Sequence, residues 1–387
     1  MDIKKLREIC GIVSGGTPLR TNAEFWDGGI IPWIKIGDIK GKYVSDADEH
    51  ITQAGLEGSS AKMLSKGTIL YTIFATLGEV GILTIDACTN QAIAGITIRN
   101  KDEVLTDYLY YYLKSKKSYV NNLGRGVAQN NINLSILRDL EVPLPTLSVQ
   151  RQTVDILDKT AKVIKYRLQQ LQKLDNLIKA RFVELFGDCV LNTKRWNTRR
   201  LGDIAEVGSS KRVFVEELRE SGIPFFRGTE IGALAEGKSI KPELFISENH
   251  YKELCSATGT PNMGDLLMPS ICPDGRIWVV NTTEPFYFKD GRVLWVHKID
   301  RSYNSIFLLY TLKERIMTDY SSIASGTTFA ELKIFALKEC RIFDAPLELQ
   351  EQFAAFVTQA DKSKTAVQKA LDESQLLFDS LMQKYFG

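Results

Sequence analysis

The feature that most constrains this chain is an internal repeat at about half its length of 387 residues. Residues 5–9 recur as 200–204, and residues 31–39 recur as 223–231. From residue 126 to the last residue, the two copies match at one fixed offset of 200 residues, as in the pairs Gly126/Gly326, Leu147/Leu347, Gln150/Gln350 and Phe186/Phe386. A repeat of this length predicts two copies of one structural unit.

The offset between the copies shows which parts tolerate changes in length. In the earlier parts of the two copies it varies between 192 and 197 residues, whereas it stays at 200 after residue 126. Loops absorb insertions at little cost, but one extra residue in a helix rotates every later side chain by about 100°. The fixed stretch therefore predicts one long helix in each copy, over residues 148–187 and 348–387.

Apolar residues recur every seven positions along both predicted helices, as in two helices that pack together. We expect these side chains to pack the helices or to bind a partner: Leu157, Ile164, Leu168, Leu171, Ile178, Phe182, Phe353, Val357, Val367, Leu371, Phe378 and Leu381. A helix of about 40 residues is rarely stable alone. The pattern favours an antiparallel coiled coil, and separate docking of each helix onto another surface is the alternative.

The stretches before the helices differ in kind, because they contain short β-rich runs separated by Gly and Asn turns. Such runs cover residues 30–36, 68–74, 80–84 and 266–271, and a helix is expected at 107–113. Each stretch is predicted to be a compact α+β domain. The predicted order is a first domain at 1–147, a connector helix at 148–187, a second domain at 188–347 and a C-terminal connector helix at 348–387.

Charge and composition exclude several classes of protein. The 49 basic and 47 acidic residues leave a net charge of +2, so any nucleic acid must be bound by local patches. The six cysteines form no Cys-x-x-Cys pair, which argues against a zinc site or a disulfide framework. The N-terminus lacks the apolar core of a signal peptide and no run of residues is apolar enough to span a bilayer, so we expect a cytoplasmic protein without membrane contact.

Several motifs stand in a fixed order along the first copy. They are Gly-Gly-Thr-Pro at 15–18, the run at 31–39, Gly-Thr-Ile-Leu at 67–70, Gly-Glu-Val at 78–80, Asn-Gln at 90–91 and Val-Pro-Leu-Pro-Thr-Leu at 142–147. The second copy keeps Gly-Thr-Thr at 326–328 and Ala-Pro-Leu-Glu-Leu-Gln at 345–350. This ordered set resembles the specificity subunits of type I restriction-modification systems, and the resemblance covers nearly the whole chain.

The resemblance implies two target recognition domains, each binding one half of a split, asymmetric sequence in double-stranded DNA. It also implies that the long helices hold two methyltransferase subunits and, through the complex, restriction and translocase subunits. The chain itself would carry no catalytic residue, no metal and no cofactor, while S-adenosylmethionine, ATP and magnesium would be bound by the partner subunits.

The absence of several sequence motifs also argues against a catalytic role for this chain. The chain has neither an Asn-Pro-Pro-Tyr nor an Asp-Pro-Pro-Tyr tetrapeptide, no glycine-rich turn of the type that binds S-adenosylmethionine, and no Gly-x-x-x-x-Gly-Lys-Ser/Thr loop for ATP. A metal-dependent nuclease is disfavoured because Pro273-Asp274 lacks a following Glu-x-Lys. The alternatives are a protein-binding scaffold or assembly factor that reads no specific DNA sequence, and a catalytic enzyme of unfamiliar fold.

Polar side chains on loops are the candidates for DNA contact, since Arg and Lys suit phosphate or guanine, Asn and Gln suit adenine, and Ser and Thr suit either. In the first domain they are Thr17, Arg20, Lys35, Lys40, Lys42, Thr76, Gln91, Gln129, Asn130 and Asn131. In the second domain they are Ser209, Ser210, Lys211, Arg212, Arg227, Thr229, Arg276, Lys289, Arg292, Thr327 and Thr328. Each could instead serve only its turn.

Overall fold

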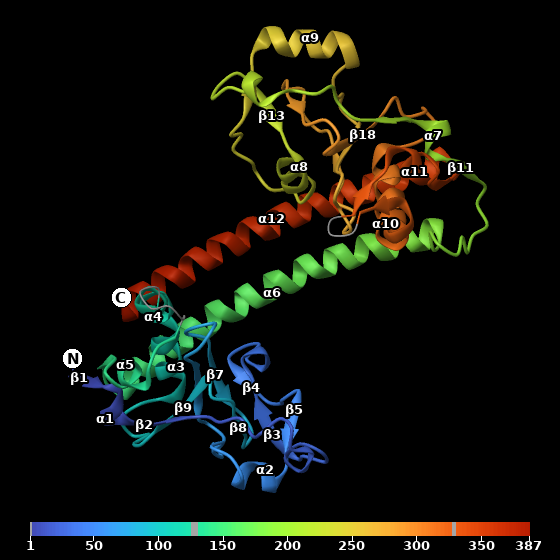
Figure 1. The fold of residues 1–387 in the computed structure, drawn as a ribbon. Helices are drawn as coiled ribbons and strands as arrows, with labels where there is room; N and C mark the ends of the chain where they lie inside the picture. The colour runs from blue at the N-terminus through green and yellow to red at the C-terminus, as the bar shows by residue number, and fades with distance from the viewer. Residues whose placement is uncertain (1, 125–130, 327–329) are drawn as a thin grey trace. The chain divides into compact units, whose positions relative to one another are not determined.

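A computed structural model describes residues 2–124, 131–326 and 330–387 (Figure 1). The chain forms two compact units, which we call the first unit (Met1–Leu168 with Lys369–Gly387) and the second unit (Gln169–Gln368). Two helices of 40 residues, α6 (Leu147–Phe186) and α12 (Leu347–Phe386), each contribute one part to both units. Among the described residues, no helix combines the length and apolar character needed to cross a membrane.

Sheets form the centre of the first unit. One sheet has the strand order β2 (Cys10–Ser14), β9 (Ile93–Ile98), β6 (Ile69–Thr72), β7 (Val80–Leu83) and β4 (Tyr43–Val44). A second has the order β5 (Glu49–Ile51), β3 (Ile31–Ile34) and β8 (Cys88–Thr89), and a third pairs β1 (Asp2–Lys5) with β10 (Glu141–Leu144). The helical segments are α1 (Leu6–Ile9), η1 (Ala23–Phe25), η2 (Ile36–Asp38), α2 (Gln53–Glu57), α3 (Thr106–Ser115), α4 (Lys117–Gly124) and α5 (Leu134–Arg138).

The second unit repeats this plan. Its main sheet has the order β12 (Glu206–Gly208), β18 (Val293–His297), β15 (Leu266–Pro269) and β16 (Trp278–Val279), and a second sheet has the order β14 (Phe245–Ile246), β13 (Ile223–Phe226) and β17 (Tyr287–Phe288). Two further pairs join β11 (Thr198–Arg200) to β21 (Arg341–Phe343) and β19 (Ala324–Ser325) to β20 (Glu331–Leu332). The helical segments are α7 (Leu201–Ile204), η3 (Val215–Glu217), α8 (Gly228–Ala235), α9 (Glu248–Thr258), α10 (Ser305–Ile323) and α11 (Ile334–Lys338).

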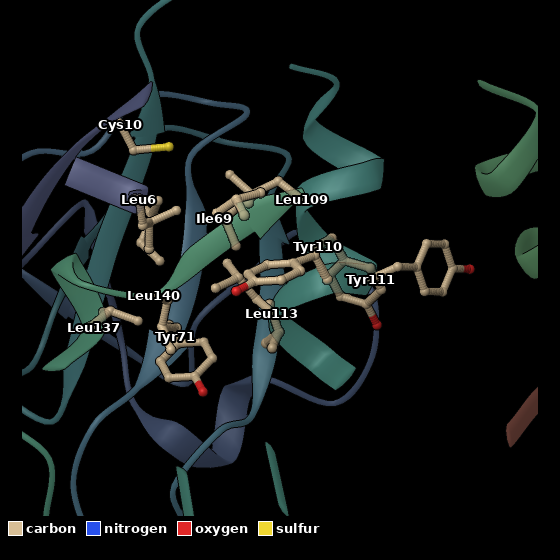
Figure 2. Close-up of a cluster of buried hydrophobic side chains, with 14 of the residues drawn as sticks. Leu6, Cys10, Ile69, Tyr71, Leu109, Tyr110, Tyr111, Leu113, Leu137 and Leu140 are labelled. Atoms are coloured by element: carbon tan, nitrogen blue, oxygen red, sulfur yellow. The ribbon is translucent and has the colours of Figure 1, made fainter. Parts of the chain in front are cut away.

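The core of the first unit lies between α3 and the main sheet. Figure 2 shows Leu109, Tyr110 and Tyr111 of α3 beside Ile69 and Tyr71 of β6, and all five side chains are buried. Burial of so many aromatic rings supplies most of the driving force for this packing. The cluster extends to α6 through Leu157 and to α12 through Phe378 and Phe386.

Within each unit the two long helices run antiparallel. In the first unit, the Tyr111 hydroxyl donates to Asp158 of α6, and the Tyr111 ring lies 6.2 Å from the ring of Phe378 in α12. The Tyr108 hydroxyl donates to the Pro143 carbonyl, just before α6 begins, and the Tyr108 ring lies 5.3 Å from the ring of Phe386 at the end of α12. In the second unit, the rings of Phe186 and Phe353 are 5.7 Å apart and Lys364 Nζ is 2.8 Å from Asp175. Positions that advance along α6 thus meet positions that recede along α12. The α+β class and the antiparallel helices are confirmed.

One glutamine fixes the start of each long helix. Gln150 is completely buried: its Nε2 donates to the carbonyls of Glu103 (2.8 Å) and Pro145 (2.9 Å), and its Oε1 accepts from the backbone N–H of Leu105 (2.9 Å). Gln350 makes the equivalent three bonds: its Nε2 donates to the carbonyls of Ser302 and Ala345, and its Oε1 accepts from the backbone N–H of Asn304. The internal repeat therefore preserves a complete hydrogen-bond network that joins helix to domain.

Candidate nucleic-acid interface

In the first unit, three of the predicted DNA-contacting residues lie on loops that meet at one end of the main sheet. The strand register places Ser14 opposite Ala94, Thr72 opposite Ile93 and Tyr71 opposite Val80. The loops that follow β2 and β6 and the loop that precedes β9 therefore meet at this end. They carry three of the candidate residues, Thr17, Thr76 and Gln91.

The loop after β2 is held against the loop after β8. Backbone N–H groups of Gly15 and Gly16 donate to the carbonyls of Ile93 (3.1 Å) and Thr89 (2.9 Å). A Cβ on Gly15 would lie 2.2 Å from the Asn90 carbonyl oxygen, so no larger residue fits there. The Thr17 hydroxyl donates to the side-chain oxygen of Gln91. This contact uses the side-chain oxygen of the exposed Gln91 and leaves its two N–H donors for a ligand.

Two further candidates share one carboxylate. Lys35 Nζ lies 2.6 Å from Glu49, and Arg20 also pairs with Glu49 while its guanidinium stacks 3.9 Å from the centre of the Trp26 ring. Hydrogen bonds from Lys35 and then Arg20 hold the pKa of Glu49 below its ordinary value. Exposed ion pairs of this kind contribute little stability. Both cations can therefore exchange Glu49 for phosphate at small cost.

The structure gives Lys42 a different role from the predicted DNA contact. Its side chain is 15% exposed, and its Nζ lies 2.7 Å from Asp107 of α3 and 2.6 Å from Asp158 of α6. Burial by itself would lower the pKa of Lys42, but the hydrogen bonds that it donates to both carboxylates outweigh it and raise that pKa. Lys42 joins the sheet to the long helix in the protein without DNA, and its predicted contact with DNA stays a prediction.

The remaining candidates of the first unit are less constrained. Lys40 is 75% exposed and its Nζ is 4.0 Å from Asp48. Asn131 forms an isolated β-bridge with Phe74 in the turn between β6 and β7, next to Thr76. Gln129, Asn130, Thr327 and Thr328 lie outside the described residues, and their predicted contact with DNA stays a prediction.

The second unit builds its site at the same end of its main sheet. There, Gly208 lies opposite Trp295 and Pro269 opposite Val293. The Ser209 hydroxyl donates to the Val293 carbonyl (2.7 Å) and the Ser210 hydroxyl to the Phe288 carbonyl (2.6 Å). Next in the chain, the Lys211 backbone N–H donates to the Tyr287 hydroxyl (2.9 Å). These three contacts fix the loop after β12 against β17 and the first residue of β18.

Four arginines surround this fixed loop, and each pairs with a carboxylate. Arg212 pairs with Asp290, Arg227 with Glu230 and Glu243, Arg276 with Asp274, and Arg292 with Glu331. Burial would raise the pKa of Glu230, but hydrogen bonds from Arg227 outweigh it and lower that pKa to about 2. Thr229 also donates to Glu230. Lys289 follows β17, and its side chain is exposed.

The two sites correspond in position but not in chemistry. In the first unit, the loop after β2 contacts the residue two positions beyond β8, through Thr17 and Gln91. In the second unit, the loop after β12 contacts the residue two positions beyond β17, through Arg212 and Asp290. An uncharged pair is thus replaced by an ion pair on the same framework. Such a replacement changes which base edges the loop can bind.

Sequence reasoning missed the carboxylates of both sites. Glu49, Asp290 and Glu331 are far along the chain from the cations that they bind, so no local pattern marks them. Glu230 could have been found from the sequence, because it stands three residues after Arg227 and accepts from the Arg227 backbone N–H at the start of α8. Asp38 accepts from the Lys35 backbone N–H in the same way at the start of η2.

Most of the residues predicted to pack the helices face inward. Leu157, Ile178, Phe182, Phe353, Val357 and Phe378 are buried, and Ile164, Leu171, Val367, Leu371 and Leu381 are half-buried. Leu168 is 54% exposed, so it does not pack between the helices, and of its two predicted roles only contact with a partner stays a prediction. Three other apolar side chains on α6 are also exposed: Val149, Ile156 and Val163, which are spaced seven residues apart.

A family of known proteins matches almost the whole chain. The family described as the type I restriction modification DNA specificity domain matches twice, over residues 1–176 and 193–374. The chain is 26% identical to the MjaIX type I restriction enzyme specificity subunit of Methanocaldococcus jannaschii, an alignment that covers 99% of this chain and 92% of the relative. It is 25% identical to a putative type I restriction enzyme specificity subunit of Haemophilus influenzae, over 74% of this chain and 72% of the relative.

Solved structures share the fold. The S subunit of a type I restriction-modification system from M. genitalium superposes with a TM-score of 0.57 at 16% identity, covering all of this chain and 96% of that one. A chain from a study of complex assembly and conformational transition in the type I R-M system gives a TM-score of 0.59 at 17% identity, covering all of this chain and 97% of that one. With two family matches that repeat the two structural units, this chain belongs to the type I restriction modification DNA specificity family.

Proposed function

We propose that this chain is the DNA specificity subunit of a type I restriction-modification complex and that each unit binds one half of a split DNA sequence. One observation carries the proposal: two loop clusters occupy equivalent ends of equivalent sheets, yet they present different polar side chains. A duplicated catalytic site would keep its chemistry, whereas a duplicated reading site must vary it to read two different half-sequences.

Local charge supports DNA binding where the overall charge does not. The net charge of +2 provides almost no long-range attraction for DNA. The candidate loops nevertheless hold Arg20 and Lys35 in the first unit, and Lys211, Arg212 and Arg292 in the second. All of these cations except Lys211 pair with half-buried carboxylates, so they are positioned before DNA arrives and can still turn to phosphate or base.

We further propose that the long helices bind two methyltransferase subunits and that restriction and translocase subunits join through the complex. The exposed apolar residues Val149, Ile156 and Val163 support a partner on α6, because they lie one heptad apart along one face. S-adenosylmethionine, ATP and magnesium would act on those partners. We expect calorimetry on this chain alone to detect no stoichiometric binding of S-adenosylmethionine, and such binding would contradict this division of roles.

Exchange of one domain tests the main proposal. Residues 1–147 would be replaced by the equivalent domain of a relative that methylates a different sequence, and the chimaera would be expressed with its methyltransferase. Methylome sequencing should show one half of the methylated sequence changed and the other half retained. A change in both halves would show that the two units do not read DNA independently.

A further inference from the structure

We propose that Arg212, oriented by Asp290, reads a guanine in the half-sequence bound by the second unit; this inference rests on the proposed DNA-reading function. Its basis is the geometry of one exposed guanidinium at the end of the main sheet. Arg212 Nε donates to Asp290 Oδ2 at 3.0 Å, and the arginine side chain is 69% exposed while that of Asp290 is 20% exposed. The carboxylate is therefore fixed in the surface and the arginine projects beyond it.

The way in which Asp290 contacts Arg212 leaves the recognition edge open. The carboxylate takes the Nε donor, so the two Nη groups at the tip remain for a ligand. Guanine presents two acceptors, O6 and N7, in the major groove, and the paired Nη donors of arginine match them. An arginine held by Nε presents this fork in one orientation, which lowers the entropy that binding would cost.

The backbone that carries Arg212 is also fixed. The three preceding residues, Ser209, Ser210 and Lys211, each donate to the segment from Tyr287 to Val293, at 2.7, 2.6 and 2.9 Å. Asp290 lies in that same segment, and Gly291 N–H donates to the Ser209 hydroxyl at 2.9 Å. Both ends of the side chain are thus anchored to one rigid turn, as precise base recognition requires.

The neighbouring arginines of the second unit are less suited to this task. Arg227 engages Glu230 through both Nε and Nη2 and also reaches Glu243 with Nη2, so its fork is occupied. Arg276 is also held through Nε, by Asp274 at 3.0 Å, but its Nη1 lies 3.7 Å from Glu236, and Arg292 uses Nη1 on Glu331. Among the arginines described at this end of the sheet, Arg212 is held through Nε alone in the contacts that the structure shows.

The first unit provides a contrast that favours reading over simple phosphate binding. At the equivalent contact it has Thr17 and Gln91, a pair without charge. A phosphate contact would be needed by both units, because the DNA backbone is the same in both half-sequences. A base contact must differ between the two units, because the two half-sequences differ. In the second unit Asp290 stands where the first has Gln91, and it pairs with Arg212, whose side chain suits guanine.

The test uses the full chain in complex with its methyltransferase. Methylome sequencing first gives the two half-sequences, and domain exchange assigns one of them to the second unit. Binding is then measured on duplexes in which each base pair of that half is replaced in turn. For Arg212→Ala we expect the preference for one G·C pair to fall by roughly 10- to 100-fold, with the other half-sequence read as before.

Two further variants separate base reading from charge or folding. Arg212→Lys keeps the charge but lacks the fork, so it should lose the same preference. Asp290→Ala keeps Arg212 but releases it, so it should weaken the preference without weakening binding to unrelated DNA. Arg301→Ala, an exposed arginine next to the opposite end of the sheet, is the matched control and should read both halves normally.

Each outcome is decisive. If Arg212→Ala weakens binding equally for every duplex and lowers the salt dependence by about one phosphate contact, the residue binds the backbone and the inference is overturned. If both half-sequences are read unchanged, the inference is also overturned. If the wild-type complex itself shows no sequence preference, the proposed DNA-reading function fails, which is a different result from the failure of Arg212.

Discussion

At the scale of single residues, Gln150 joins the first sheet-containing domain to α6 through three buried hydrogen bonds. Replacement by Leu would leave the Leu105 N–H and the Glu103 carbonyl without partners in a buried position. We expect Gln150→Leu to lower the free energy of unfolding by about 3 kcal/mol in urea denaturation. Gln172→Leu, on an exposed position of the same helix, is the control, and an equal loss in both variants would contradict this role.

Glu230 makes the stability of the second unit depend on pH. Its pKa is lowered from 4.5 to about 2 in the folded protein. A carboxyl whose pKa is lower in the folded state adds stability above its unfolded pKa, and this stability is lost as the pH falls through the folded value. We expect Glu230→Gln to flatten the decline in unfolding free energy between about pH 5 and pH 2. Glu243→Gln, at a side chain that is 72% exposed, should leave the decline intact, and a decline that persists in Glu230→Gln would refute the assignment.

Sequence alone could identify the partners of charged side chains only where the two residues are a few positions apart in the chain. The pairing of Lys35 N–H with Asp38 and of Arg227 N–H with Glu230 follows from a spacing of three residues at a helix start. Lys42 and Asp158, in contrast, are 116 residues apart. Their contact depends on how β4 and α6 pack, so Lys42 was indistinguishable from a surface lysine until the fold was known.

At the scale of elements, the seam between α6 and α12 depends on a few large side chains. Phe182 is 3% exposed, and its ring lies 5.1 Å from that of Phe186 and 5.3 Å from that of Phe353. We expect Phe182→Ala to lower the free energy of unfolding by about 3–5 kcal/mol, since a cavity would remain. The adjacent Val183 is 49% exposed, and Val183→Ala should change stability by less than about 0.5 kcal/mol. Similar melting curves for the two variants would show that the inward face is assigned wrongly.

The seven-residue pattern predicted the long helices and most of their inward residues, but it did not show on which face Leu168 lies. Leu157, Ile164, Leu171 and Ile178 follow one heptad position, and all four are buried or half-buried. Leu168, four residues after Ile164, is exposed. Which face of the helix is buried at its middle therefore depends on packing, and the sequence pattern does not contain this information. Leu157 and Ile178 are buried because they pack in hydrophobic clusters that contain aromatic side chains.

At the scale of the whole molecule, the fixed 200-residue offset from Leu147/Leu347 to the last residue indicates that helix length and phase are both constrained. If the helices set the spacing of the two half-sequences, removal of one heptad from each helix should shorten the unspecified DNA between them. The antiparallel pairing of Asp175 with Lys364 shows which segments must be removed together. Deletion of residues 169–175 with residues 364–370 takes one heptad from each side and keeps both apolar stripes in phase.

A heptad deletion shortens a helix by about 10 Å, which corresponds to roughly three base-pair steps of 3.4 Å. We expect the methylated sequence of the double deletion to keep both half-sequences and to have a spacer about three base pairs shorter. Deletion of two residues from α6 alone swings the later side chains by about 200° and should give an unstable or inactive complex, because Phe182 and Phe186 would leave the seam. Methylome sequencing reads the spacer directly. A fully active heptad variant with an unchanged spacer would show that the bound methyltransferases, rather than the helices, set the distance between the half-sequences.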